Sequence, residues 1–231
     1  MELSLRAAAD IDRSALKRLL NESGLSVSAL ATAQACLFDS LCLSSDQAPV
    51  REATVKHLQA EIELAAELGS AIIFGGIRGR LDGEAAGQAG QHAAALDAMA
   101  RCAHHAAGMG VEILIEPINR YETNFINTTD EAIALLNELK LPGLRILLDT
   151  FHMNIEEVSI TDAIRRAGSH LGYVHLVDSN RRAPGQGHLP FDSILGVLDE
   201  IGFAGPLVAE VMPLPDDETA ARHTAEFWSA A

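Results

Sequence analysis

Four residues with metal-binding side chains each follow a short apolar run. They are Glu116 in the segment ILIEP, Asp149 in ILLDT, His175 in YVHL and Glu210 in VAEVM. Three carboxylates and one imidazole suit a hard or borderline divalent ion such as Mn²⁺, Mg²⁺ or Co²⁺. Each residue taken singly is equally compatible with capping a strand or a helix. As a set they favour a cation, because buried carboxylates without a partner repel one another and are costly.

The elements that must position these residues are short apolar runs that alternate with longer amphipathic stretches. The runs that we predict to be strands are Leu3–Leu5, Val27–Ala31, Ala71–Phe74, Val111–Ile115, Leu144–Leu148, Tyr173–Val177 and Leu207–Val211. The stretches that we predict to be helices are 13–22, 51–68, 88–108, 129–139, 161–167, 191–201 and 216–228. Near-continuous apolar strands separated by helices predict a parallel sheet that is covered on both faces. The glycine-rich segment 82–91 is predicted to be a mobile loop.

This alternation is typical of both an open, doubly wound α/β sheet and a (β/α) barrel, and periodicity alone does not separate them. The polar residues decide between them, because each of the four follows a different strand. In a barrel, the carboxyl ends of the strands converge on the one face where barrel enzymes carry out their chemistry. In an open sheet, four such ends are spread along a line and do not all reach one ligand. We therefore predict a TIM barrel that forms a single domain over residues 1–231.

The composition excludes several classes of protein. Apolar residues make up 48% of the 231 positions, which is too many for a disordered chain. No segment approaches about 18 uninterrupted apolar residues and no signal peptide is visible, so we predict a cytoplasmic protein with no membrane partner. The net charge of −15 argues against a nucleic-acid partner, because such affinity comes mainly from Lys and Arg. Cys36, Cys42 and Cys102 lack zinc-type spacing, which indicates free thiols in a reducing compartment.

Three longer motifs carry a family resemblance. They are EPINRYETNFIN at 116–127, LLDTFHMNIEE at 147–157 and HLVDSNRRAPGQGH at 175–188, and the likeness continues loosely upstream through GLSVSALAT and GGIRGR. The chain resembles the xylose isomerase-like TIM barrels, a superfamily of sugar phosphate isomerases and epimerases. Within it the chain is most similar to the ketose 3-epimerases typified by D-tagatose and D-psicose 3-epimerase. The resemblance implies a small sugar as substrate and one divalent ion, Mn²⁺ first, with Mg²⁺, Co²⁺ or Zn²⁺ as alternatives.

The resemblance also assigns roles within the set of strand-end residues. It places the family's four metal ligands on the four residues already selected, and it makes Glu116 and Glu210 a pair of acid–base groups. Epimerisation removes a proton from one face of a carbon beside a carbonyl and returns a proton on the other face. Glutamates from the fifth and last strands of a barrel can approach that carbon from opposite sides. A metal ion acting as a Lewis acid would stabilise the intervening enediolate.

Further residues match the family's substrate-binding positions, namely Glu122, His152 and Arg181. The alternatives are a surface salt bridge with Arg120 for Glu122, a core imidazole for His152 and a solvated loop charge for Arg181. Arg78, in the GGIRGR segment, follows a predicted strand. We predict that it binds a carboxylate or phosphate at the far end of a substrate, the alternative being an ordinary loop arginine.

Three other functions are compatible with the same motifs. An aldose–ketose isomerase of the hydroxypyruvate isomerase type uses the same enediolate but protonates a different carbon. An inosose-type dehydratase expels hydroxide from that intermediate. A non-enzymatic sensor or scaffold predicts that at least one ligand position is lost, whereas all four ligand positions are filled here.

A barrel of this type has eight strand–helix units, and seven are visible in the sequence. Aligned by motif, the run Leu3–Leu5 resembles the family's second strand. The sequence therefore predicts that the first strand and its helix are missing. We expect Leu3–Leu5 and Leu207–Val211 to present unpaired edges, through which the chain would form a homo-oligomer.

Overall fold

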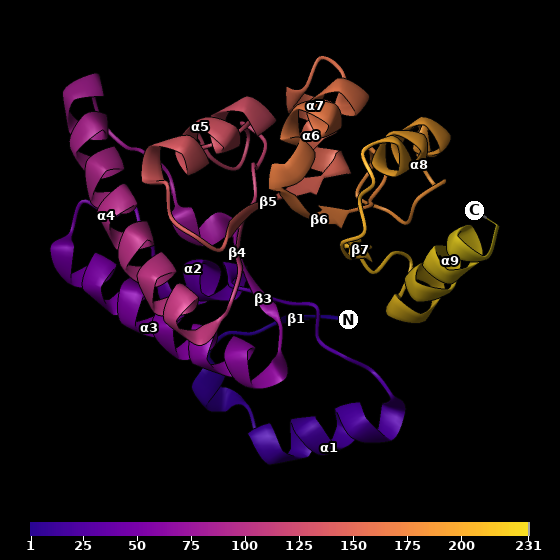
Figure 1. The fold of residues 1–231 in the computed structure, drawn as a ribbon, viewed down its shortest axis with the longest axis horizontal. Helices are drawn as coiled ribbons and strands as arrows, with labels where there is room; N and C mark the ends of the chain where they lie inside the picture. Colours follow the sequence, from indigo (N-terminus) through magenta and orange to yellow (C-terminus); the bar gives the residue numbers. More distant parts are fainter. Residues whose placement is uncertain (231) are drawn as a thin grey trace. The chain divides into compact units, whose positions relative to one another are not determined.

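The computed structural model describes residues 1–230 (Figure 1), and the chain divides into two compact units. The first unit consists of Met1–Ile115, Tyr121–Phe125 and Leu135–Arg145. The second unit consists of Glu116–Arg120, Ile126–Ala134 and the chain from Ile146 onward. The division falls within helix α5 (Thr129–Leu139) and strand β5 (Leu144–Asp149), so each of these elements contributes residues to both units.

Four parallel strands form the sheet of the first unit. They pair in chain order and are β1 (Glu2–Ser4), β2 (Ala29–Ala31), β3 (Ala71–Phe74) and β4 (Ile113–Ile115). The helices of this unit are α1 (Arg13–Ser23), α2 (Ala33–Asp39), α3 (Ala48–Leu68) and α4 (Ala85–Met109). All three residues of β4 and three of the four in β3 are buried, as expected for a sheet covered on both faces.

The long helices α3 and α4 pack against each other within the first unit (Figure 1). The buried residues Val55, Leu58, Ile62 and Ala65 of α3 recur every three or four positions, so they lie on one face of the helix. Helix α3 ends before Gly69, whose φ of 66° lies in the left-handed region that favours glycine. The helix therefore ends where the sequence predicts, and it starts three residues before the predicted range of 51–68.

Three parallel strands form the sheet of the second unit. They are β5, β6 (Leu171–His175) and β7 (Leu207–Val208), paired in that order. The helices of this unit are α6 (Thr150–Glu156), α7 (Ile160–Ala167), α8 (Phe191–Glu200) and α9 (Asp217–Ala230), of which α7 and α8 pack together (Figure 1). None of the helices within residues 1–230 combines the length and the apolar character that crossing a membrane requires.

The seven predicted strands and seven predicted helices are all present in the described residues, together with two α-helices that were not predicted. The unpredicted helices are α2 and α6. Helix α6 begins directly after Asp149, whose carboxylate accepts hydrogen bonds from the backbone N–H groups of Phe151 and His152 at 2.8 and 3.2 Å. Asp149 is therefore the N-cap of a short helix as well as a strand-end residue.

The prediction of a mobile loop at 82–91 was wrong from Ala85 onward, because helix α4 starts there. Two glycines lie in the first turns of this helix and lower its intrinsic propensity. Further along, Ala95, Met99, Cys102 and Ala106 are buried at helical spacing. Tertiary packing of such a face supplies most of the stability of a helix, which explains why the glycine-rich start is helical.

Candidate functional site

Three carboxylates surround one ring nitrogen of His175 in the second unit. The Nδ1 atom of His175 lies 3.6 Å from Oε1 of Glu116, 3.5 Å from Oδ2 of Asp149 and 3.5 Å from Oε2 of Glu210. One ligand atom from each of the four residues lies within 4.8 Å of the others. The structure thus brings together the four residues that the sequence places at strand ends. We call them the carboxylate–histidine cluster.

The register of the second sheet explains why two members of the cluster are neighbours. Asp149 and His175 are the last residues of β5 and β6, and they are directly paired. Paired residues of adjacent strands point to the same face, so their side chains lie side by side. The hydroxyl of Thr150 joins the two strand ends, because it donates to the carbonyl of Val177 at 2.6 Å and accepts from its N–H at 2.9 Å.

The charge of the cluster fits a divalent cation. Glu116 and Asp149 are buried, whereas 42% of the Glu210 side chain is exposed. Arg181 forms ion pairs with Asp149 and Glu210, so three negative charges and one positive charge leave an excess of two negative charges when His175 is neutral. The separations of 3.5–3.6 Å from His175 are too long for strong hydrogen bonds to offset this repulsion. A divalent ion balances the excess, and such ions accept a set of oxygen donors with one imidazole.

The surroundings of the carboxylates keep them ionised. Burial by itself would raise the pKa of Asp149, yet the positive charge of Arg181 holds that pKa below its ordinary value. Burial also tends to raise the pKa of Glu210, but His175 and Arg181 lower this pKa below the usual range. The positive charge of Arg181 therefore favours the ionised form of both side chains, which is the form that binds a metal ion.

Arg181 is held against the cluster by the loop that follows β6. Its Nη1 donates to Oδ2 of Asp149 at 2.6 Å, and its Nη2 donates to Oε2 of Glu210. Its guanidinium carbon lies 5.0 Å from the centre of the Phe151 ring, a cation–π distance. The backbone of Arg181 has a φ of 62°, which is uncommon for a residue other than glycine. The side chain is therefore fixed within the site, in contrast to the alternative of a solvated loop charge.

The loop that carries Arg181 is organised by Asp178, a residue that was not predicted from the sequence. The Asp178 carboxylate is buried and accepts four backbone hydrogen bonds of 2.7–3.1 Å, from the N–H groups of Ser179, Gly185, Gly187 and Leu189. A Cβ atom at Gly187 would lie 2.2 Å from Oδ1 of Asp178, so only glycine fits there. An aspartate followed by closely spaced glycines is a turn signal that is visible in the sequence.

We expect Asp178→Ala to destabilise the protein and to lower its activity. The substitution leaves four backbone N–H groups without their acceptor, which predicts a loss of about 2–4 kcal/mol in the free energy of unfolding once water has replaced some of the bonds. Urea unfolding at pH 7 measures the loss. The matched control is Asp199→Ala on the exposed surface of α8, for which a change below about 0.5 kcal/mol is expected.

The effect of Asp178 should also depend on pH with a defined sign. Burial acts to raise its pKa, but the backbone N–H groups of Ser179, Leu189 and Gly187 hold it below the usual range in the folded chain. Such a group stabilises the protein above its unfolded pKa of about 3.9, and this contribution is lost as the pH falls through the lower, folded value. The difference between the wild-type chain and Asp178→Ala should therefore shrink below about pH 4. A difference that stays constant there would contradict the assignment.

His152 lies on α6 and is buried beside the cluster. Its backbone N–H donates to Oδ1 of Asp149 at 3.2 Å, and its ring meets that of Phe151 edge-on with centroids 5.4 Å apart. Two of the predicted substrate-binding residues, His152 and Arg181, therefore both contact Asp149.

Glu122 and Arg78, the other two predicted substrate-binding residues, belong to the first unit. Glu122 is exposed, and its carbonyl accepts a hydrogen bond from Nη1 of Arg80 at 3.0 Å. Arg120, proposed above as an alternative partner for Glu122, forms an ion pair with Glu156 at 2.8 Å. The substrate-binding role of Glu122 stays a prediction.

Arg78 lies in the interior of the first unit. Only 1% of its surface is exposed, and its guanidinium donates to the carbonyls of Phe74 at 2.6 Å and Phe125 at 3.2 Å. These bonds tie the end of β3 to the segment 121–125. The geometry favours a structural role, and the contact of Arg78 with a charged group of a substrate stays a prediction. The sequence places an arginine after a strand, but it does not show that the side chain folds back onto the backbone.

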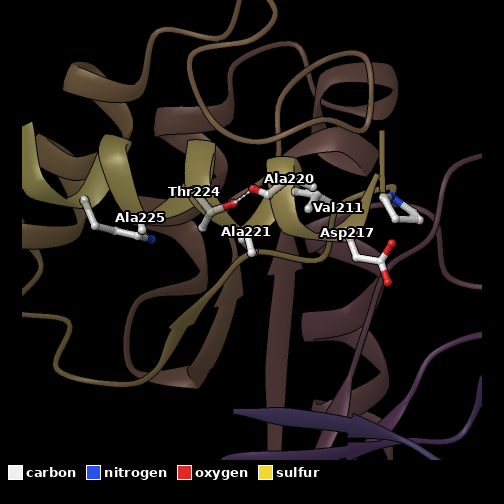
Figure 2. A pocket seen from close by; sticks show the side chains of 9 residues that line it. Val211, Asp217, Ala220, Ala221, Thr224 and Ala225 are labelled. Atoms are coloured by element: carbon white, nitrogen blue, oxygen red, sulfur yellow. Dashed lines mark hydrogen bonds between the residues drawn. The ribbon is translucent and has the colours of Figure 1, made fainter. Parts of the chain in front are cut away.

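An apolar cavity of about 530 Å³ lies beside the segment that carries Glu210 (Figure 2). It is lined by residues from the segment after β7 and from α9, namely Ala209, Val211, Pro213, Asp217, Ala220, Ala221, Thr224, Ala225 and Trp228. Both chain neighbours of Glu210 line the cavity, whereas Glu210 contacts His175. The residues that line the cavity do not include Glu210 itself. The cavity is therefore separate from the carboxylate–histidine cluster.

Comparisons with known proteins relate the chain to sugar epimerases. The model of the family described as "Xylose isomerase-like TIM barrel" matches residues 2–231. The ketose 3-epimerase of Arthrobacter globiformis is 35% identical over 215 residues, which are 91% of this chain and 72% of that protein. The D-psicose 3-epimerase of Agrobacterium fabrum is 35% identical over 171 residues, and the match spans 73% of this chain and 59% of that protein.

The solved structures agree with the sequence comparisons. A crystal structure of the D-allulose 3-epimerase from Methylomonas sp. matches with a TM-score of 0.84 and 30% identity, and the match covers 99% of this chain and 85% of that one. These findings confirm the predicted TIM-barrel fold and the predicted family, and the predicted enzyme class is the one named for these relatives. The chain therefore belongs to the xylose isomerase-like TIM barrel family.

Proposed function

We propose that the protein is a metal-dependent ketose 3-epimerase, which inverts the carbon next to the carbonyl of a ketose. The observation that carries this proposal is the pair formed by Glu116 and Glu210. These glutamates follow two different strands, and a carboxylate oxygen of each lies within 3.6 Å of Nδ1 of His175. The names of the relatives, ketose 3-epimerase and D-psicose 3-epimerase, support the substrate class.

In the proposed reaction, one of the two glutamates takes the proton from C3 of the ketose, and the other returns a proton to the opposite face. When the first proton leaves, the electron pair of the C–H bond moves into the C2–C3 bond and the substrate becomes an enediolate. Return of a proton to C3 restores the carbonyl at C2 with the configuration of C3 inverted. Each glutamate therefore alternates between carboxylate and carboxylic acid, as general acid–base catalysis requires.

The carboxylate–histidine cluster holds the metal ion in this proposal, with Mn²⁺ first and Mg²⁺, Co²⁺ or Zn²⁺ as alternatives. When bound, a divalent ion supplies Lewis-acid stabilisation of the negative charge that develops on the substrate oxygens. Arg181 adds a fixed positive charge next to Asp149 and Glu210. His152 and Arg181 bind the oxygens on C1 and C2 of the ketose, and Glu122 binds a hydroxyl group. We also propose that residues 1–231 act as one barrel domain, which the family match over 2–231 supports.

A deuterium experiment tests the proposed reaction. The protein is incubated with Mg²⁺ in D₂O together with D-fructose, D-psicose, D-tagatose or L-ribulose, and the sugars are followed by NMR. We expect the 3-epimer to appear with deuterium at C3, because the returned proton comes from a glutamate that exchanges with solvent. Deuterium at C1 together with an aldose product would indicate an isomerase, and loss of water would indicate a dehydratase. Either result would overturn the proposal.

A further inference from the structure

The imidazole of His152 receives two contacts from one neighbouring residue, Asn119. The side-chain Nδ2 of Asn119 lies 2.8 Å from Nδ1 of His152, and the backbone nitrogen of Asn119 lies 3.4 Å from the same atom. Both residues are buried in the second unit. Asn119 lies three positions after Glu116 in the chain, and His152 lies three positions after Asp149. The contact therefore links the segments that carry two members of the carboxylate–histidine cluster.

The backbone contact shows which nitrogen of His152 carries the proton in this structure. A backbone N–H can only donate, so Nδ1 of His152 must be the acceptor in this pair. The amide of Asn119 is then oriented with its NH₂ group toward the same atom, because a carbonyl oxygen there would face the lone pair of Nδ1. A neutral imidazole carries one N–H group, and with Nδ1 occupied as an acceptor that group is at Nε2.

The main chain of His152 is fixed by its place on helix α6. Its backbone N–H is bound to Oδ1 of Asp149 at 3.2 Å, and its ring packs edge-on against Phe151. His152 is therefore held by its backbone N–H, by the ring of Phe151 and by the contacts at Nδ1. Its Nε2 is the ring nitrogen that is left to form a hydrogen bond with a substrate.

We propose that Asn119 is a positioning residue that holds His152 as the Nε2–H tautomer, so that His152 presents a hydrogen-bond donor to an oxygen of the ketose. The assignment of the tautomer stands on the two contacts alone, whereas the identity of the acceptor rests on the proposed function. A donor at this place binds a carbonyl or hydroxyl oxygen and stabilises negative charge as it develops there. The reversed tautomer would present a lone pair to the same oxygen and repel it.

The tautomer is measured directly by NMR on protein with ¹⁵N-labelled histidine. Spectra that correlate ring carbon-bound protons with both ring nitrogens are recorded at pH 8, above the ordinary histidine pKa of about 6.5, without metal and with Mg²⁺. The chain has nine histidines, and the His152 signals are identified as those that disappear in His152→Gln. We expect a protonated Nε2 and a bare Nδ1. A bare Nε2, or protons on both nitrogens, would overturn the proposal even if Asn119→Asp cannot be produced.

The variant Asn119→Asp replaces the donor with an acceptor of the same shape. The backbone N–H remains, but the side-chain contact of 2.8 Å is shorter than the backbone contact of 3.4 Å, so we expect the proton of His152 to move to Nδ1. We expect kcat/KM to fall by about 10- to 100-fold, the range for losing a hydrogen bond to a developing charge. Asn154→Asp is the matched control, because it adds the same charge on the same helix two positions from His152. The control should keep the wild-type tautomer and most of the activity.

The outcomes separate this inference from the proposed function. An unchanged tautomer in Asn119→Asp would overturn the positioning role of the Asn119 side chain, whatever the protein does to ketoses. The expected tautomers in a protein without epimerase activity would support the positioning role and count against the proposed function alone. A reversed tautomer with unchanged kcat/KM would show that the donor at Nε2 does not act on the substrate.

Discussion

Replacing either Glu116 or Glu210 with glutamine is expected to lower kcat by about 10²- to 10⁴-fold while the protein stays folded, because general acid–base groups contribute that much to catalysis. Glutamine keeps the size of the side chain and one oxygen that can bind a metal ion, but its amide cannot accept the proton from C3. Both substitutions should have this effect, since each direction of the epimerisation uses one glutamate as base and the other as acid. Steady-state rates with a ketose measure the fall in kcat, and circular dichroism spectra show whether each variant is folded.

The matched control is Glu200→Gln on α8, an exposed carboxylate whose ion pair with Arg165 lies on the surface. This control tests whether the loss of any one negative charge slows the reaction. We expect an unchanged kcat, because exposed pairs of this kind contribute only about 0.2–1 kcal/mol to stability and the variant therefore stays folded. Titration with Mn²⁺ shows whether each variant still binds the ion. If Glu116→Gln or Glu210→Gln keeps more than about a tenth of the wild-type kcat, the acid–base assignment is wrong.

Removing the divalent ion with a chelator is expected to abolish epimerisation and to lower the thermal midpoint. Three carboxylates then face one another with Arg181 as the positive group that contacts two of them, so the folded chain retains their repulsion. Adding back Mn²⁺ should restore activity and stability. An ion that binds only the folded chain stabilises that chain by about 2.7 kcal/mol when the free ion concentration is a hundred times the Kd. Thermal unfolding across a range of Mn²⁺ concentrations measures this effect.

Two variants make the metal experiment specific to the cluster. Asp149→Asn should lose the rise in thermal midpoint on addition of Mn²⁺, because it removes a buried ligand. Asp162→Asn on α7, where the side chain is exposed and pairs with Arg165, should keep the rise. Full activity in protein shown by elemental analysis to be free of metal would rule out the metal-dependent mechanism.

The members of the carboxylate–histidine cluster were predictable because a local sequence pattern, a polar residue after an apolar run, indicates where each side chain lies in the barrel. Glu116, Asp149, His175 and Glu210 are the first strongly polar residues after apolar runs, and the carboxyl ends of parallel strands in a barrel meet at one face. The strands themselves were predictable for the same reason, since a buried parallel strand reads as a short apolar run. The observed strand ends differ from the predicted ones by up to three residues, and the four side chains at or just after these ends still meet.

The residues that support the cluster were not predictable in this way. Asn119 and Asp178 lie in irregular segments, and their partners are backbone N–H groups and a ring nitrogen that no pattern of residue types reveals. Helix α6 was missed because it has only two turns and because its capping residue, Asp149, had already been interpreted as a ligand. Arg78 was correctly predicted to follow a strand, but its burial depends on a contact with the carbonyl of Phe125, which comes from a distant segment.

The way in which Asp178 holds its loop has a consequence for how this protein can change. All four hydrogen bonds come from the main chain, so the path of the loop does not depend on the side chains of Arg182 or Gln186, which are exposed. Substitutions at these two positions can alter the surface of the loop while Arg181 keeps its place. Selection, or a designer, can therefore vary residues 182 and 186 without disturbing the arginine on which the proposed chemistry depends. Residues 178 and 187 offer no such freedom, since the first is the common acceptor and the second has no room for a side chain.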